Sequence, residues 1–249
     1  MTPESLFFVA VILLVAGFVH SAIGFGMAIV ALSLLPFVID AKVAHIMFAL
    51  CSIPMLLMVA WEYRRGFDWS SIWPALIGAA IFLPIGLYLF KVMSLDLLVR
   101  CTGGAILAMV FWSLVNKRIK KTQSDKRFVA WASFAAGSIS GFLGGAVSIG
   151  GPPLASFGLS QGWKPERFKA FLTHCLLVMS VYKVLGLFAA SMVTRESLIP
   201  FIWATPFAIV GIHFGAKVSG KLNPEKFQAV VAVVLIGISL MLIYRGQPS

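Results

Sequence analysis

One stretch, Gly141 to Pro153, limits most strongly what this chain can fold into. Its sequence is Gly-Phe-Leu-Gly-Gly-Ala-Val-Ser-Ile-Gly-Gly-Pro-Pro, and it lies within an uncharged run from Phe128 to Gln161. Inside a helix, glycine costs about 1 kcal/mol and proline about 3 kcal/mol relative to alanine, so the stretch predicts a broken helix. A weaker copy, Gly17 to Gly26, lies near the N-terminus. At membrane depth such breaks are tolerated only where the freed backbone is buried in protein or lines a wet cavity.

The chain is too apolar for an ordinary soluble domain. Of its 249 residues, 60% are hydrophobic and 12% are charged, whereas soluble domains carry about 25% charged residues. Apolar runs long enough to cross a bilayer recur throughout, which predicts an all-α polytopic membrane protein. The net charge of +11 collects in short loops between these runs. We therefore interpret it as an orientation signal and not as a nucleic-acid surface.

The apolar runs predict both the membrane segments and the domain organisation. The runs are residues 5–39, 43–61, 71–90, 97–115, 128–160, 170–190, 197–216 and 227–244. Two of them, 5–39 and 128–160, are long for one helix and short for two full crossings. For these two we expect either a re-entrant hairpin or a tight pair of short helices meeting at the glycines. The predicted domains are a first repeat (1–115), a basic cytoplasmic linker (116–127) and a second repeat (128–249).

The two halves follow one plan. A shift of 124 residues pairs Gly17 with Gly141 and Gly26 with Gly150, and internal duplication is common in transporter folds. If the broken segments return to the side they entered from, most Lys and Arg residues fall on the side of the linker. If they cross once, the basic residues divide almost evenly. The positive-inside rule favours the first arrangement, which leaves three crossings in each half and predicts an inverted repeat.

The second break predicts an anion site. Pro152 and Pro153 suit the first turn of a helix, where their missing N–H is not needed. They predict a half-helix whose N-terminus points into the protein at mid-membrane, with Gly26 beginning the matching half-helix from the other side. Free N–H groups and the positive end of the helix dipole attract anions there. The alternative is that the glycines serve only close helix packing.

The candidate substrate-binding residues lie in the two breaks and on the helix after the second break. They are His20, Ser21, Gly24, Gly26, Ser148, Gly150, Gly151, Pro152, Thr173 and Lys183. Ser138 and Ser140 are further hydroxyl donors. Lys183 is either a counter-charge for the anion or a side chain that snorkels toward the helix end. His20 either binds the anion or carries a coupled proton, or it is a packing histidine.

No motif predicts an enzyme, a cofactor or a metal. The apolar runs contain no acidic residue, so the carboxylate pair of an intramembrane protease is missing, as is the carboxylate of a proton or sodium antiporter. Neither a Walker A sequence nor an HExxH sequence is present. The three cysteines lie in apolar runs without the spacing of a disulfide framework or a zinc site, and we expect them to be small core residues.

At its two glycine motifs the chain resembles the TauE/SafE family of sulfite and organosulfonate exporters. The resemblance is carried by His20 to Gly26 (His-Ser-Ala-Ile-Gly-Phe-Gly), by Gly141 to Pro153, and by Asn223-Pro224 before the final helix. It covers essentially the whole chain. It implies secondary transport of a small sulfur-containing anion, such as sulfite, thiosulfate or an organosulfonate like sulfoacetate. The first motif departs from a glycine-richer version by carrying His20 and Ser21.

The resulting hypothesis is a secondary transporter that binds its anion between the two breaks and works by alternating access. The membrane potential or a proton on His20 would supply the energy. The alternatives are an anion-selective, channel-like pore, a transporter of another small organic anion, and a membrane enzyme or assembly subunit. The expected partners are the anion and the lipid bilayer, with no nucleic acid. The direction of transport and the oligomeric state are left open.

Overall fold

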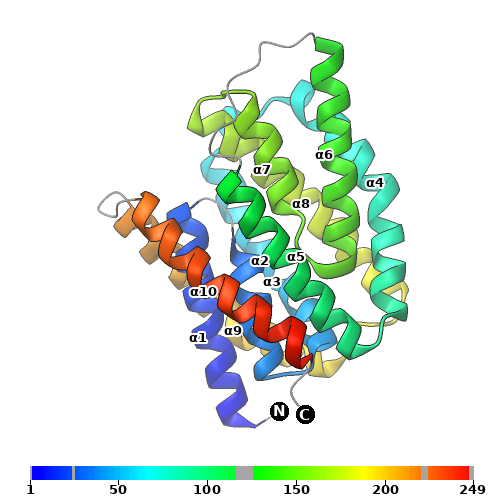
Figure 1. Ribbon diagram of the computed structural model, residues 1–249, viewed down its shortest axis with the longest axis vertical. Helices are drawn as coiled ribbons and strands as arrows, with labels where there is room; N and C mark the ends of the chain where they lie inside the picture. Colours follow the sequence, from blue (N-terminus) through cyan, green and yellow to red (C-terminus); the bar gives the residue numbers. More distant parts are fainter. Residues whose placement is uncertain (1, 24–25, 116–125, 220–223, 247–249) are drawn as a thin grey trace. The chain divides into compact units, whose positions relative to one another are not determined.

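The computed structural model describes residues 2–23, 26–115, 126–219 and 224–246. Within these residues every regular element is a helix, which confirms the predicted all-α class (Figure 1). The helices are α1 (Pro3–Ile23), α2 (Met27–Leu34), α3 (Ala41–Glu62), α4 (Trp69–Val92), α5 (Leu95–Val115), α6 (Lys126–Val147), α7 (Gly151–Ser160), α8 (Pro165–Ala189), α9 (Arg195–Ser219) and α10 (Pro224–Arg245), with short 3-10 helices at Leu35–Phe37 and Arg64–Gly66. In the part of the chain described, α1, α3, α4, α6, α8 and α9 are long and apolar enough to cross a membrane. The chain is a multi-pass membrane protein.

The helices follow the same order twice. In α1–α5 and again in α6–α10, a long helix is followed by a short helix and then by three long ones. Both predicted breaks are present, because α2 and α7 are short helices that follow the glycine motifs. The expectation of two short helices at the first break was wrong. The 21-residue helix α1 is full length, because the pair of glycines that interrupts the apolar run, Gly24 and Gly26, comes only after Ile23.

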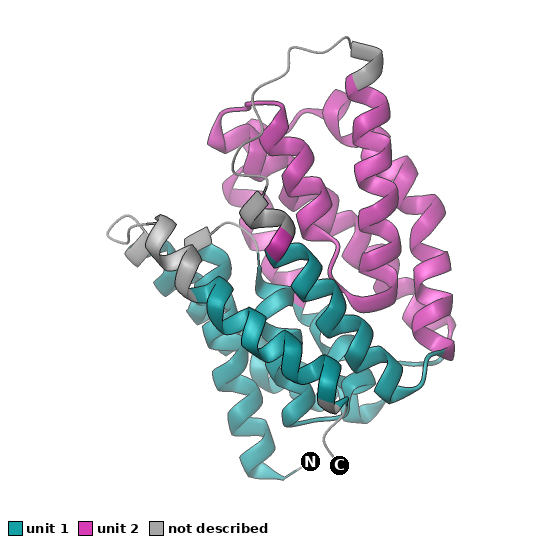
Figure 2. Cartoon of the chain, in the orientation of Figure 1, with its two compact units in different colours: residues 1–51, 93–110, 191–249 teal, residues 52–92, 111–190 magenta. Residues whose placement is uncertain are grey.

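Two compact units make up the chain (Figure 2). Unit 1 contains residues 1–51, 93–110 and 191–249, and unit 2 contains residues 52–92 and 111–190. Each unit therefore takes segments from both halves of the sequence. Most of the linker predicted at 116–127 lies outside the described residues. The division into sequence halves and their inverted arrangement stay predictions.

A pair of glycine-lined helices forms the main packing contact of each unit. In unit 1, α1 packs along α9, and in unit 2, α6 packs along α4. A Cβ on Gly17 would overlap the carbonyl of Ala208, and a Cβ on Gly141 would lie 2.7 Å from the Cα of Ala79. Gly17 and Gly141 are 124 residues apart, and Ala79 and Ala208 are 129 apart. The same helix contact is therefore built twice, each time between helices of different sequence halves.

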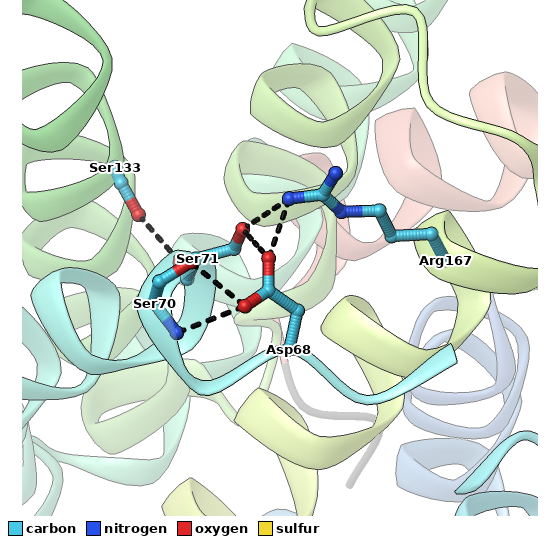
Figure 3. A network of polar contacts seen from close by, with 5 residues as sticks. All are labelled: Asp68, Ser70, Ser71, Ser133 and Arg167. Carbon is cyan, nitrogen blue, oxygen red and sulfur yellow. Dashed lines mark hydrogen bonds and ion pairs between the residues drawn. The ribbon is translucent and has the colours of Figure 1, made fainter. Parts of the chain in front are cut away.

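Unit 2 contains a re-entrant hairpin made of α6 and α7. In the second turn of α6, the Ser133 hydroxyl donates to the carbonyl of Ser71, in the first turn of α4. In the first turn of α8, Arg167 donates to the Asp68 carboxylate and to the Ser71 hydroxyl (Figure 3). The starts of α4, α6 and α8 therefore lie at one end of the unit. Because α8 begins only five residues after α7 ends, the chain returns through α7 to the end where α6 began.

Unit 1 has the same arrangement around α1 and α2. The start of α1 and the end of α10 lie at one end of the unit (Figure 1). The Arg100 guanidinium donates to the carbonyl of Ile243, which brings the start of α5 to the end of α10. His45, in the second turn of α3, contacts Thr102 of α5. The chain therefore leaves this end through α1 and has returned to it where α3 begins.

Candidate functional site

The second break is a short link between α6 and α7 with a strained backbone. Ser148 lies in the left-handed region, with φ of 57°, which residues other than glycine rarely adopt. The Ile149 N–H donates to the carbonyl of Leu143 over 3.3 Å and so closes the end of α6. Gly150 then caps α7. Strain of this kind persists only where the surrounding structure fixes it, and the contacts of this link supply that fixation.

Helix α7 begins near mid-depth of unit 2. A Cβ on its first residue, Gly151, would lie 3.9 Å from Leu176 of α8. Leu176 comes eleven residues after Pro165, the first residue of the 25-residue helix α8. At 1.5 Å per residue this is about 16 Å along a helix of about 37 Å. The predicted half-helix therefore exists, and its N-terminus lies inside the depth of the unit.

Few backbone donors remain at this helix start. Pro152 and Pro153 have no N–H, so two of the groups that a helix normally leaves unpaired at its start are absent. The N–H groups of Gly150 and Gly151 have no acceptor among the described residues. Two adjacent glycine amides and the positive end of α7 are what this site offers an anion.

Gly150 is required by close packing, and Gly151 is not. A Cβ on Gly150 would lie 2.7 Å from the carbonyl of Ser140 and 3.0 Å from the methyl group of Met179. Ser140 itself is fully buried, and its hydroxyl has no hydrogen-bond partner within the described part of the chain. A buried hydroxyl without a partner is costly, so the Ser140 hydroxyl is a candidate donor on the α6 residue whose carbonyl packs against Gly150.

Lys183 lies at the break and does not snorkel to the end of α8. Its side chain is 4% exposed. The Nζ donates to the carbonyls of Gly144 (2.7 Å) and Gly145 (3.0 Å) and to the hydroxyl of Ser148 (2.7 Å). It also lies 5.2 Å from the centre of the Phe90 ring. The three N–H groups of the ammonium are thus directed at the last turn of α6 and at the strained Ser148.

Other polar candidates have different surroundings. Ser138 donates to the carbonyl of Phe134 within α6, and its hydroxyl packs against Gly78 of α4, so it belongs to a helix contact. Thr173 is buried in α8, one turn before Leu176. Its neighbour His174 contacts the carbonyl of Ala170 and the ring of Phe67, on the side of the α3–α4 loop.

The first break is described only in part. His20 is half-buried in the last turn of α1. Ser21 packs on α9, because a Cβ on Gly215 would lie 2.9 Å from the Cβ of Ser21. Gly24 lies outside the described residues. Gly26 caps α2 with φ of 108°, a conformation that favours glycine. The carbonyl of Gly26 accepts from the Val30 N–H over 3.0 Å and so begins the hydrogen bonding of α2.

A chain with two such helix breaks in an all-α membrane protein has relatives in a known protein family. The family model of the sulfite exporters TauE/SafE matches residues 9–242. The chain belongs to the TauE/SafE family. The match covers nearly the whole chain, including both breaks. Searches of curated proteins and of solved structures each gave no match. The TauE/SafE chain is thus a membrane transporter of a family described as sulfite exporters.

Sequence reasoning missed His45 of this TauE/SafE protein. His45 is fully buried in α3, and its Nε2 lies 3.2 Å from the hydroxyl of Thr102. The Thr102 hydroxyl also donates to the carbonyl of Leu98 over 2.8 Å. Since a hydroxyl has one proton to give, the Nε2 of His45 is the donor toward Thr102. The sequence contained a signal for it, because His45 is an ionisable residue near the start of the apolar run 43–61, and such residues usually have a partner inside the protein.

Proposed function

We propose that this TauE/SafE protein carries a small sulfur-containing anion, such as sulfite, thiosulfate or sulfoacetate, across the bacterial inner membrane by alternating access. The observation that carries the proposal is the start of α7 near mid-depth, next to a buried lysine and a buried hydroxyl without a partner. Half-helix starts at membrane depth are where secondary transporters hold anionic substrate groups.

The electrostatics of the second break favour an anion. A helix start carries about half a positive charge, and Lys183 adds a cation that forms no ion pair with a carboxylate among the described residues. Sulfite and sulfonates present several oxygen acceptors on one tetrahedral or pyramidal centre. Such a centre can accept several hydrogen bonds, and the donors offered near the break are the N–H groups of Gly150 and Gly151, with the Ser140 hydroxyl as a further candidate.

The candidate residues divide into groups with different roles. The amides of Gly150 and Gly151 would contact the anion, and Pro152 would fix the helix start. Ser148 and Lys183 would shape the break from the α6 side, and Thr173 would line α8. In unit 1, His20, Ser21, Gly24 and Gly26 belong to the matching break, which precedes α2. That the two breaks act on one anion, and that His20 carries a coupled proton, stay predictions.

The first test is thermal unfolding of the detergent-purified protein with sulfite, thiosulfate, sulfoacetate, taurine, sulfate and chloride. A ligand at a hundredfold excess over its dissociation constant stabilises the folded state by about 2.7 kcal/mol. We expect a shift with one or more of the sulfur anions and none with chloride. Absence of any shift would contradict the sulfur-anion proposal.

The second test separates a carrier from a pore. The protein is reconstituted in vesicles loaded with unlabelled anion, and uptake of the same labelled anion is followed. A carrier gives saturable uptake that accelerates through exchange, whereas a pore gives conductance far above carrier turnover. Saturable counterflow is the expected outcome, and ion conductance without it would contradict alternating access.

A further inference from the structure

The ammonium of Lys183 lies in a cage of three oxygen atoms. Two are the carbonyls of Gly144 and Gly145, and the third is the hydroxyl of Ser148, at 2.7, 3.0 and 2.7 Å. The carbonyls belong to the last turn of α6, the end of a helix that carries about half a negative charge. The side chain is 4% exposed, so water contributes little to this cation's surroundings.

Such a cage has the composition of a small-cation site. In transporters with broken helices, unwound carbonyls and half-helix C-termini coordinate the coupling Na⁺, while half-helix N-termini hold the anionic substrate. Here the carbonyls at the end of α6 are occupied by the ammonium of Lys183, a side chain of the protein itself. We propose that Lys183 is a built-in cation that takes the place of a dissolved coupling cation at the second break.

The position of the cation has a consequence for the neighbouring anion site. Only residues 148–150 separate the negative end of α6 from the positive start of α7. Without a cation, the two helix ends would largely cancel for an approaching anion. Lys183 neutralises the α6 end and leaves the break positive. Because its three N–H groups are already engaged, it acts as a positioning residue and not as a direct ligand.

In the first half of the chain, no lysine stands at the position that corresponds to Lys183. The position 124 residues before Lys183 is Val59, and the position 124 residues before Gly144 is His20. The two breaks therefore differ in their basic group. The second break has Lys183, from the long helix α8 that follows it. The first break has His20, in the last turn of α1, the helix that precedes it.

The test is cation-dependent stability, which needs no sulfur anion and so does not depend on the proposed substrate. Thermal unfolding of the full-length purified protein is measured in NaCl, in methylammonium chloride and in N-methylglucamine chloride at equal ionic strength. We expect the wild-type melting temperature to be the same in all three salts. Lys183→Ala empties the cage, so it should melt at a lower temperature and regain stability as Na⁺ or methylammonium is raised, with saturation.

Two variants serve as controls. Lys169→Ala removes a lysine of the same helix that donates to the hydroxyl of Tyr63, far from the break, and it should show no specific cation response. Lys183→Ala combined with Ser148→Ala removes one oxygen of the cage and should weaken the response to Na⁺. A folded Lys183→Ala protein with no specific response to either cation would overturn the proposal. So would a saturable Na⁺ response of the wild-type protein.

Lys183→Ser is the second variant, for the case in which the alanine variant is not recovered folded. It also empties the cage, while its short polar side chain stays near the backbone of α8, so it should show the same saturable response to Na⁺. Its failure to respond would overturn the proposal, whatever the outcome of the tests with sulfite or sulfoacetate.

Discussion

At the scale of single residues, the two adjacent glycines at the start of α7 differ in what they tolerate. A Cβ at position 150 would lie 2.7 Å from the Ser140 carbonyl, a backbone atom that cannot move away cheaply. At position 151 the nearest atom is 3.9 Å away, at the end of the flexible Leu176 side chain. The two glycines therefore have different roles: close packing requires Gly150, whereas position 151 has room for a larger side chain.

We predict that Gly150→Ala removes transport and lowers stability by about 1–3 kcal/mol, the usual cost of overpacking. Gly151→Ala should insert normally and keep most of the flux, because its Cβ makes only an ordinary van der Waals contact with Leu176, at 3.9 Å. The measurements are uptake of the anion identified by the thermal-shift panel and thermal unfolding, with protein inserted in the membrane as the reference. Equal effects of the two substitutions would contradict the packing argument.

The Asp68 carboxylate gives a prediction for pH. Hydrogen bonds from Ser70 and Ser71, together with the Arg167 guanidinium, hold the pKa of Asp68 below its usual value (Figure 3). A lowered folded-state pKa stabilises the fold above the unfolded pKa of about 3.9, and this stabilisation disappears as the pH falls through the folded-state pKa. Asp68→Asn should therefore destabilise by about 1 kcal/mol at pH 7, since a third of the side chain is exposed.

The difference between wild type and Asp68→Asn should narrow below about pH 4, when the carboxyl of the wild-type protein is protonated. Asp96→Asn is the matched control, because Asp96 pairs with Arg100 one turn away on an exposed surface. It should cost less than the Asp68 change. A difference for Asp68→Asn that stays constant from pH 7 to pH 3 would contradict the carboxylate's role.

At the scale of helices, the pairs α1–α9 and α4–α6 depend on glycines at matching places. A Cβ on Gly86 of α4 would overlap the carbonyl of Phe142, and a Cβ on Gly215 of α9 would lie 2.5 Å from the carbonyl of Phe18. Small residues let helix backbones approach closely where lipid supplies no hydrophobic drive for association. The same contact thus holds both units together.

We predict that Gly86→Val and Gly215→Val each lower the melting temperature, and by similar amounts, because each side chain would force apart an equivalent helix pair. Gly104→Ala of α5 is the control. Its Cβ would meet no atom within 4 Å, and alanine is favoured over glycine in a helix by about 1 kcal/mol. This variant should be as stable as the wild type or more stable. Tolerance of valine at either position would show that the pair is not the main packing contact of its unit.

Local chemistry explains which elements the sequence could predict. Glycine and proline act on the backbone of their own segment, so both breaks, the start of α7 and the order of helices follow from residues such as Pro152. The partners of α4 and α9 come from the other half of the chain, and hydropathy does not contain that information. Lys183 shows the same limit. Its place in an apolar run could be read from the sequence, but the choice between burial and snorkelling, and the contact with Gly144, depend on how α8 packs against α6.

At the scale of the whole molecule, the predicted membrane topology rests on two features. These are the distribution of Lys and Arg residues between the loops, and the return of each broken segment to the end at which it started. The broken segment of each unit comes back to the end at which it started, so it adds no net crossing to its half. The arrangement favoured by the positive-inside rule rests on this condition. That arrangement predicts that the basic linker between the halves lies in the cytoplasm.

We therefore predict that a cysteine at position 120, in the linker, is labelled by a membrane-impermeant maleimide only after the inner membrane is opened. The background should be Cys101→Ser, because Cys101 is exposed, whereas Cys51 and Cys175 are buried. A cysteine in place of Lys91, at the end of α4, is the matched control. Because α5 (Leu95–Val115) lies between the two positions and is expected to cross the membrane, the cysteine at position 91 should react in intact cells. Labelling of position 120 without opening the membrane would reverse the orientation, and labelling of both positions from one side would contradict a crossing by α5.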